Sequence, residues 1–349
     1  MERTLTYADA IREATEQEMA RDPRVIVMGL GVDDPKGIYG TTLGLRDEFG
    51  PERVFDTPLS EDAMTGVAIG ASLAGLRPIH VHQRMDFLLL AMNQLVNIAA
   101  KTRYMFAGAV SVPIVVRAII GRSWGQGAQH SQALHSLFMH VPGIKIVAPT
   151  TPYDAKGCLI RSIREHDPVI FVEHRLLHKY QEGYVAEGSY EVPLGKARVL
   201  VEGNDLTIVG ISHMAVECLR AQRYLEDVGL SAEVIDPVSL CPLDMDTIAA
   251  SVRKTGRMLV VDNGWITCGA GTEILAQVVE RFQGHLDVRV QRMGFESVTC
   301  PTTRNLETEF YPNAQTIASG AYALVHDNHE SWTPAHEEAP EILQFKGPF

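Results

Sequence analysis

Three polar clusters in this sequence carry side chains that could bind a ligand or transfer protons. They span residues 57–61, 80–87 and 121–132, and each follows a short apolar run. Parallel sheets place their sites at the carboxyl ends of strands, so these are the positions to inspect. None is a nucleotide-binding fingerprint, because Gly29 and Gly31 lack the third glycine at the required spacing and no Walker-type loop occurs. The clusters therefore predict a site and argue against nicotinamide or ATP as its ligand.

Glu61 and His130 are the candidates for proton transfer. Glu61 follows Ser60, a potential helix cap, and lies between an apolar strand end and an apolar helix. A glutamate in a first helical turn usually complements the helix dipole, but burial here would raise the pKa of Glu61 and make it a proton donor or relay. His130 follows three glycines that would let backbone approach a ligand, although an isolated histidine beside a helix cap is more often structural.

Helix and strand signals alternate along the whole chain. Thr6 and Asp9 form a capping arrangement at the start of the first predicted helix. Strands are expected at 25–28, 78–82, 112–116, 144–147, 169–172, 206–211, 232–236, 258–261 and 288–291. Helices are expected at 6–20, 62–74, 86–106, 152–165 and 271–282. Three more are expected, of which one begins after 131, one ends at 225 and one begins at 244.

Strands separated by helices at this spacing pair in parallel and are covered on both faces. The pattern weakens around 186–203. The sequence therefore predicts an α/β protein with two parallel-sheet domains, at 1–185 and 204–324, a linker at 186–203 and a tail at 325–349.

Composition excludes several functional classes. The 349 residues carry a formal charge of −12 and contain no block of Lys or Arg, so we expect no nucleic-acid or anionic-membrane partner. The charge-free apolar stretches 63–76 and 104–116 are too short to span a bilayer. The N-terminus lacks signal-peptide features, which predicts a cytoplasmic protein. The five cysteines never form a CxxC pair and are expected to be reduced and mostly buried.

Several segments together resemble a known family. In chain order they are EDAMTGVAIGASLAGLRPI, MDFLLLAMNQLVNIAAKTRYM, GAQHSQ, HVPGIKIVAPTTPYDAKG, DPVIFVEH, PLGKA and SVRKTGR. They resemble the beta subunit of thiamine-diphosphate-dependent 2-oxo acid dehydrogenases of the pyruvate, branched-chain and acetoin type, over about residues 4 to 320. The resemblance implies a pyrimidine-binding domain followed by a transketolase C-terminal-like domain. It also implies oxidative decarboxylation of a 2-oxo acid with acyl transfer to lipoamide.

The resemblance assigns roles to four residues. Glu61 matches the glutamate that hydrogen-bonds the aminopyrimidine of thiamine diphosphate and favours its imino tautomer, which then deprotonates the thiazolium carbon. Phe87 matches the aromatic residue that packs on the pyrimidine ring, and Leu59 lines the same slot. His130 matches the histidine associated with acyl transfer, where an imidazole could protonate the departing dithiolane sulfur.

The resemblance also implies ions and partners. The family's magnesium and diphosphate are held by a GDG-led motif of an alpha subunit, and this chain contains no GDG. We therefore expect an alpha subunit in an alpha2beta2 heterotetramer, with half of each active site in this chain, and a lipoyl-domain acyltransferase as acceptor. A potassium ion bound through backbone oxygens is implied near Ile114, Ser162, Glu165 and Asp167.

One segment departs from the family pattern. Where pyruvate-type members have an acid followed by mostly apolar residues, this chain has His80-Val81-His82-Gln83-Arg84. His80 and His82 share one face of the predicted strand and Gln83 lies on the other. These groups predict a polar acyl donor, with Gln83 the leading contact, or they bind the alpha subunit or the cofactor. A carboligase with an aldehyde acceptor and a non-catalytic assembly subunit remain as alternative functions.

Overall fold

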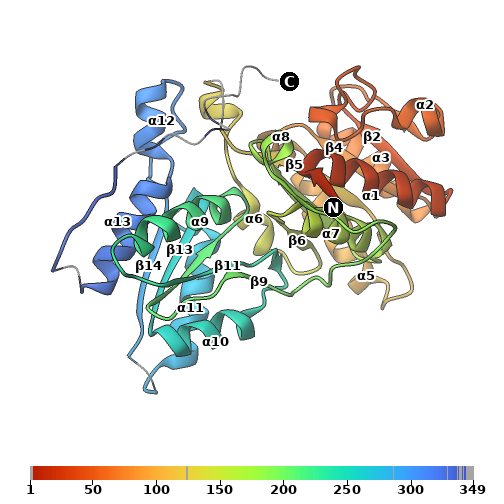
Figure 1. The fold of residues 1–349 in the computed structure, drawn as a ribbon. Helices are drawn as coiled ribbons and strands as arrows, with labels where there is room; N and C mark the ends of the chain where they lie inside the picture. The colour runs from red at the N-terminus through yellow and green to blue at the C-terminus, as the bar shows by residue number, and fades with distance from the viewer. Residues whose placement is uncertain are drawn as a thin grey trace. The chain divides into compact units, whose positions relative to one another are not determined.

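The computed structural model describes residues 3–122, 125–285, 287–327, 329–335, 337, 340 and 342. It divides into two compact units (Figure 1). The first comprises the described parts of Met1–Ser123 and His130–Leu194, and the second those of Trp124–Gln129 and Gly195–Phe345. Two residues of the glycine-rich stretch and much of the predicted tail at 325–349 lie outside the described residues.

A parallel sheet forms the centre of the first unit. Its strands lie in the order β6-β7-β5-β4-β2-β3, and all registered pairs among them are parallel. Their bounds are β2 Val25–Gly29, β3 Val54–Phe55, β4 Arg77–His82, β5 Val115–Ile120, β6 Lys145–Val147 and β7 Val169–His174. β2, β5 and β7 are buried along their whole length, as a sheet covered on both faces requires. Two short strands, β1 (Thr4–Thr6) and β8 (Glu182–Tyr184), form a separate antiparallel pair.

The helices of the first unit begin close to the predicted positions. They are α1 Tyr7–Arg21, α2 Leu45–Phe49, α3 Glu61–Leu73, α4 Met85–Leu88, α5 Ala100–Met105, α6 His135–Met139, α7 Pro152–Arg164 and α8 Leu177–Tyr180, with η1 Ile38–Gly40, η2 Leu89–Ala91 and η3 Asn93–Ala99. Thr6 caps α1 as predicted, because its hydroxyl accepts the Asp9 N–H at 3.1 Å. Ser60 occupies the N-cap position of α3, but its side chain makes no capping hydrogen bond there.

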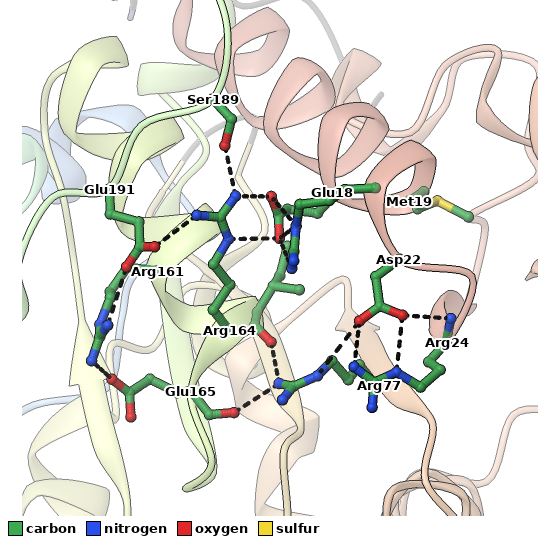
Figure 2. Close-up of polar contacts among 12 residues, drawn as sticks. Glu18, Met19, Asp22, Arg24, Arg77, Arg161, Arg164, Glu165, Ser189 and Glu191 are labelled. Atoms are coloured by element: carbon green, nitrogen blue, oxygen red, sulfur yellow. Dashed lines mark hydrogen bonds and ion pairs between the residues drawn. The ribbon is translucent and has the colours of Figure 1, made fainter.

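An ion-pair network joins α1 to α7 (Figure 2). Arg164 donates to both carboxylate oxygens of Glu18, at 3.0 and 2.6 Å, and the Glu18 side chain is fully buried. At the start of β4, Arg77 donates to the backbone oxygens of Ile163 and Glu165 at 2.7 and 2.9 Å. Because a buried carboxylate without a partner is strongly unfavourable, these contacts fix α1 and β4 against the C-terminal end of α7.

The run predicted as one helix over 86–106 changes helix type along its length. It comprises α4, the 3-10 turn η2, the π-helix η3 and α5. The buried residues Met85, Leu88, Ala91, Leu95 and Ala99 are three or four positions apart, which is also the spacing of one face of a uniform α-helix. The apolar pattern therefore predicts a helix here but not the change of helix type.

Two strand predictions differ from the structure for local reasons. The strand expected at 112–116 starts at Val115, because Pro113 has no N–H to donate to a sheet. The segment 186–203, predicted as a linker, contains β9 (Arg198–Val201), which pairs antiparallel with β11 at the edge of the second sheet. An edge strand of this kind is half-buried and gives only a weak apolar pattern.

The second unit has its own sheet, in the order β14-β13-β10-β11-β9, parallel except for β9. The other strands of this sheet are β10 Leu206–Gly210, β11 Ala232–Asp236, β13 Arg257–Trp265 and β14 Arg289–Phe295. The unit also contains β12 Ser239–Cys241, which is not a strand of this sheet. Its helices are α9 His213–Glu226, α10 Met245–Thr255, α11 Ala270–Phe282, α12 Arg304–Phe310 and α13 Ala314–Val325, with η4 Gly127–Gln129. The predicted α/β class with two parallel-dominated sheets is confirmed.

Helices cover both faces of this second sheet. Leu259 and Val261 of β13 belong to a buried cluster with residues of α9 and α13, which lie side by side in Figure 1. Val260 points the other way, towards α11, where a Cβ on Gly271 would stand 3.2 Å from its methyl carbon. Three of the five cysteines, Cys158, Cys218 and Cys300, are buried, in line with the expectation of mostly buried thiols.

Candidate functional site

The carboxyl ends of β3, β2 and β4 lie next to one another and open into a pocket. Since β2 pairs in parallel with both neighbours, the segments after β3 and β4 leave the same edge of the sheet. The pocket is a small recess that is open on one side, with about 200 Å³ of space free of protein atoms when open solvent is included. Its lining residues come from the β2, β3 and β4 ends and from the first turn of α3: Leu30, Thr57, Pro58, Ser60, Glu61, Met64, His80, Val81 and His82.

Glu61 is the carboxyl group of this pocket. It is the first residue of α3 and is half-buried, whereas the sequence argument expected a buried side chain. The difference arises because the loop before α3 is open: Leu59, predicted to line the cofactor slot, is 77% exposed. The described residues of this chain therefore leave Glu61 accessible to a ligand or a partner.

His80 and His82 form the inner wall of the same pocket. Their rings meet edge to face with centroids 4.4 Å apart. His80 Nδ1 lies 3.3 Å from the Met28 oxygen, and His82 Nε2 lies 3.3 Å from Thr65 Oγ1. Burial lowers the pKa of His80 to about 4, and burial together with His80 holds the pKa of His82 well below its ordinary value. Both imidazoles are therefore neutral at pH 7, and His80 Nε2 has no hydrogen-bond partner among the described residues.

Gln83 follows the last residue of β4 and is half-buried. Its amide nitrogen approaches Gly31 so closely that a Cβ there would lie 2.5 Å away. Gly31 also has φ +72°, a conformation that favours glycine. The glycine thus leaves room for the Gln83 amide, while His80 and His82 are only 2% and 4% exposed.

Phe87 and His130, predicted from separate segments, meet in the structure. Their ring centroids are 5.3 Å apart and the rings stand nearly perpendicular, at 79°. Phe87 belongs to α4 just after β4, and His130 follows η4. Both side chains are half-buried, so they form an aromatic edge that remains accessible.

The loop that carries His130 is bonded to the start of α4 by residues that the sequence argument missed. Gln132 donates to Asp86 Oδ1 through its backbone N–H at 3.1 Å and its side-chain amide at 2.9 Å. The Leu134 N–H lies 3.2 Å from the Met85 sulfur. One signal could have indicated this role: Asp86 is an acidic residue inside an otherwise apolar run, and buried charges are paired.

Two of the residues predicted to hold potassium use their backbone oxygens in hydrogen bonds within the chain. Ile114 O accepts the Val169 N–H, and Ser162 O accepts the Glu165 N–H. The carboxylates of Glu165 and Asp167 form other ion pairs, since Glu165 pairs with Lys145 and Arg161, and Asp167 with Arg103 and Lys145. Each carbonyl has a second lone pair, so the chemistry fits a cation held by backbone oxygens rather than by these carboxylates. Across the described residues no group of three or more His, Cys, Asp or Glu side chains could hold a metal ion.

Among the helices in the described parts of the chain, none combines the length and apolar character that crossing a membrane requires.

Two family models match the chain. The model described as "Transketolase, pyrimidine binding domain" matches residues 3–180, and "Transketolase, C-terminal domain" matches residues 195–317. A solved structure named "Split gene transketolase, inactive beta4 tetramer" has the same fold, with a TM-score of 0.75 at 20% identity, over 92% of this chain and 98% of that one.

Curated relatives are similar over most of their length. The acetoin:2,6-dichlorophenolindophenol oxidoreductase subunit beta of Cupriavidus necator is 43% identical over 92% of this chain and 97% of its own. The mitochondrial pyruvate dehydrogenase E1 component subunit beta of Pisum sativum is 41% identical over 92% and 90%. The corresponding subunit of Rickettsia bellii is 41% identical over 88% and 95%.

Proposed function

Because this chain belongs to the transketolase-like beta subunits of thiamine-diphosphate-dependent 2-oxo acid dehydrogenases, we propose that it supplies the pyrimidine side of a two-subunit active site. One observation carries the proposal. Among the residues that the structure describes, the pocket around Glu61 is lined by a carboxyl group, hydroxyl groups and neutral imidazoles, with no Lys or Arg. Such a lining suits an uncharged nitrogen heterocycle, whereas a diphosphate needs cationic groups or a metal ion. The magnesium and diphosphate are therefore assigned to an alpha partner.

Exposed apolar side chains on α3 and on the helical run next to it support an alpha partner. Val67 and Leu73 of α3 are 54% and 48% exposed, and the helical run that packs against α3 exposes Leu90, Tyr104 and Met105 at 60%, 90% and 69%. Apolar surface gathered on adjacent helices in this way marks a protein interface. A subunit seated here would also cover Leu59 and Glu61 and so complete the pocket in an alpha2beta2 heterotetramer.

Each predicted residue has a role that its position supports. When bound, thiamine diphosphate supplies the electron sink that allows a 2-oxo acid to lose carbon dioxide. Glu61 would hold a proton at the ring nitrogen of the aminopyrimidine, and the edge of Phe87 would orient that ring. His80 Nε2, which has no hydrogen-bond partner within the described part of the chain, makes the inner side of the pocket polar. His130 would donate a proton to the sulfur that departs during acyl transfer.

In the proposed overall reaction the C1–C2 bond of the 2-oxo acid breaks and carbon dioxide leaves. The electron pair of that bond reduces the disulfide of a lipoyl group, so that one sulfur takes the acyl group and the other takes a proton. We propose a lipoyl-domain acyltransferase as the acceptor protein and a cytoplasmic location. The potassium site near Ile114, Ser162, Glu165 and Asp167 remains part of the proposal.

The substrate we propose is a 2-oxo acid with a polar acyl group. Polar groups that face an aliphatic substrate would be left unpaired at about 1 to 3 kcal/mol each. Gln83 is the leading contact in this proposal because its side chain is half-buried and Gly31 leaves space for its amide, although Gln83 is not among the residues that line the pocket around Glu61. His80 and His82 line the inner wall of that pocket and are almost fully buried.

Calorimetric titration with thiamine diphosphate and magnesium tests the split site. We expect the purified chain alone to bind the cofactor poorly and to show no decarboxylation of a 2-oxo acid panel. Addition of the alpha partner should restore both binding and decarboxylation. Micromolar binding by the single chain would contradict the proposal.

A further inference from the structure

We infer that Asp86 is a positioning residue that fixes the His130 loop against Phe87. The inference rests on the proposed function, in which Phe87 orients the cofactor ring and His130 serves acyl transfer. It adds a residue that touches neither substrate nor cofactor but sets the distance between two groups that do.

The contacts between the two segments are in register. Three consecutive residues at the start of α4, which are Met85, Asp86 and Phe87, contact three alternate residues of the loop, which are Leu134, Gln132 and His130. The contacts are the 3.2 Å approach of the Leu134 N–H to the Met85 sulfur, the two Gln132 hydrogen bonds to Asp86, and the perpendicular rings of Phe87 and His130. The central contact is the strong one, because a carboxylate is a better acceptor than a thioether or a ring edge.

Of the two segments, the loop at 130–134 depends more on this contact for its position than α4 does. α4 continues into η2, η3 and α5 and packs on β4 and β5, whereas 130–134 contains no helix or strand. Asp86 and Arg175 both bind this stretch: Asp86 Oδ1 accepts two hydrogen bonds from Gln132, and Arg175 Nη2 donates to the His130 oxygen at 2.7 Å. Loss of the Asp86 contact would therefore loosen the loop at Gln132, while the packing of α4 leaves Phe87 in place.

The burial of Asp86 makes the contact specific. Asp86 is 7% exposed, and Oδ1 accepts both bonds while Oδ2 has no partner among the described residues. Asp86→Asn keeps an oxygen at the Oδ1 position and so keeps both bonds. Asp86→Ala removes the acceptor of both bonds. The pair of variants separates the hydrogen bonds from the charge.

Asp244 provides a matched control in the second unit. It is 5% exposed, and its Oδ2 accepts the Ala197 N–H at 3.1 Å across 47 residues, as Asp86 accepts the Gln132 N–H at 3.1 Å across 46. Asp244→Ala removes this comparable bond together with the cap that Asp244 gives to α10 through Thr247, far along the chain from the proposed site. If Asp86 had a purely structural role, both alanine variants should lower the two partial reactions in parallel.

The test measures two partial reactions on the heterotetramer reconstituted with its alpha partner. For Asp86→Ala we expect acylation of a lipoyl domain to fall about 100-fold, the scale of a 1 Å misplacement of a reacting group, with reduction of 2,6-dichlorophenolindophenol within about 3-fold of wild type. Asp86→Asn should restore the acylation rate to within about 5-fold. Asp244→Ala should change both rates by the same factor. Equal losses in both assays for Asp86→Ala, or no rescue by Asp86→Asn, would overturn the inference.

Hydrogen–deuterium exchange gives a readout that does not depend on activity. The Gln132 N–H is bonded to a side chain rather than to backbone, so Asp86→Ala should speed its exchange at least about 10-fold while Asp86→Asn leaves it protected. Unchanged exchange in Asp86→Ala would refute the contact itself. If the wild-type heterotetramer fails to decarboxylate any 2-oxo acid, the proposed function fails, and the exchange result still decides whether Asp86 holds the loop.

Discussion

Glu173→Gln should destabilise the first unit strongly, because it breaks a fully buried ion pair. Arg117 Nε and Nη2 donate to the two oxygens of Glu173 at 2.5 and 2.8 Å, and neither side chain is exposed. His178 Nε2 lies 2.9 Å from the same carboxylate. Removal of one partner leaves the Arg117 charge buried without compensation, which costs about 3 to 5 kcal/mol.

The pKa of Glu173 gives a second estimate of the same size. Burial alone would raise that pKa, but the Arg117 charge, its hydrogen bonds and His178 lower it from 4.5 to about 2. At about 1.4 kcal/mol per pKa unit this difference corresponds to about 3 kcal/mol of stability. A carboxyl group whose pKa is lowered on folding contributes fully above its unfolded pKa and loses the contribution as the pH falls towards its folded pKa. The gap between wild type and Glu173→Gln should therefore close between about pH 4.5 and pH 2.

Urea denaturation of the purified chain, followed by circular dichroism, measures this prediction. Glu191→Gln is the control, since the same chemical change is made in the Figure 2 network, where Glu191 is 32% exposed and its loss should cost about 0 to 1 kcal/mol. The double variant Arg117→Met/Glu173→Leu should lose less than Glu173→Gln, because it leaves no charge unpaired. Similar losses for Glu173→Gln and Glu191→Gln would refute the reasoning.

Three predictions concern the proposed reaction in the reconstituted heterotetramer. Glu61→Gln should lower every thiamine-dependent step by about 10² to 10⁴ in steady-state assays; a variant that retains dye-linked activity would contradict the role of Glu61. His130→Ala should reduce lipoyl-domain acylation far more than dye reduction, and equal losses would remove its special role. Gln83→Met should shift preference in a substrate panel from hydroxylated 2-oxo acids towards 2-oxoisovalerate. The polar-pocket proposal is wrong if 2-oxoisovalerate is already the best wild-type substrate and Gln83→Met leaves the ranking unchanged.

Sequence patterns predicted those features of the fold that depend on residues a few positions apart. The Thr6 cap and the start of α1 follow from a hydroxyl placed three residues before an amide that needs an acceptor. The shared side of His80 and His82 follows from the two-residue period of a strand, and their rings do meet. Apolar runs between glycines likewise placed most strands of both sheets.

Contacts between segments that are far apart in the sequence could not be predicted from such patterns. The change of helix type after α4 depends on which of Leu88, Ala91 and Leu95 the neighbouring strands and α3 bury, and that is decided by packing. The Asp86–Gln132 bonds join positions 46 residues apart. Sequence spacing placed both residues near the ends of strands but contained no rule to pair them.

The half-buried state of Glu61 could not be predicted because it depends on whether a partner subunit covers the pocket. This dependence would make the activity of Glu61 conditional on assembly. The sequence argument assigned Glu61 a buried, proton-holding carboxyl, yet this chain places it beside exposed Leu59 and the exposed side chains of α3. If the alpha subunit covers that surface, association removes water from Glu61 and creates the apolar surroundings that raise the pKa of a carboxyl group. The chemistry assigned to Glu61 would then depend on the assembled enzyme, because a free beta subunit lacks both the diphosphate side of the site and the water-excluded surroundings that this chemistry requires.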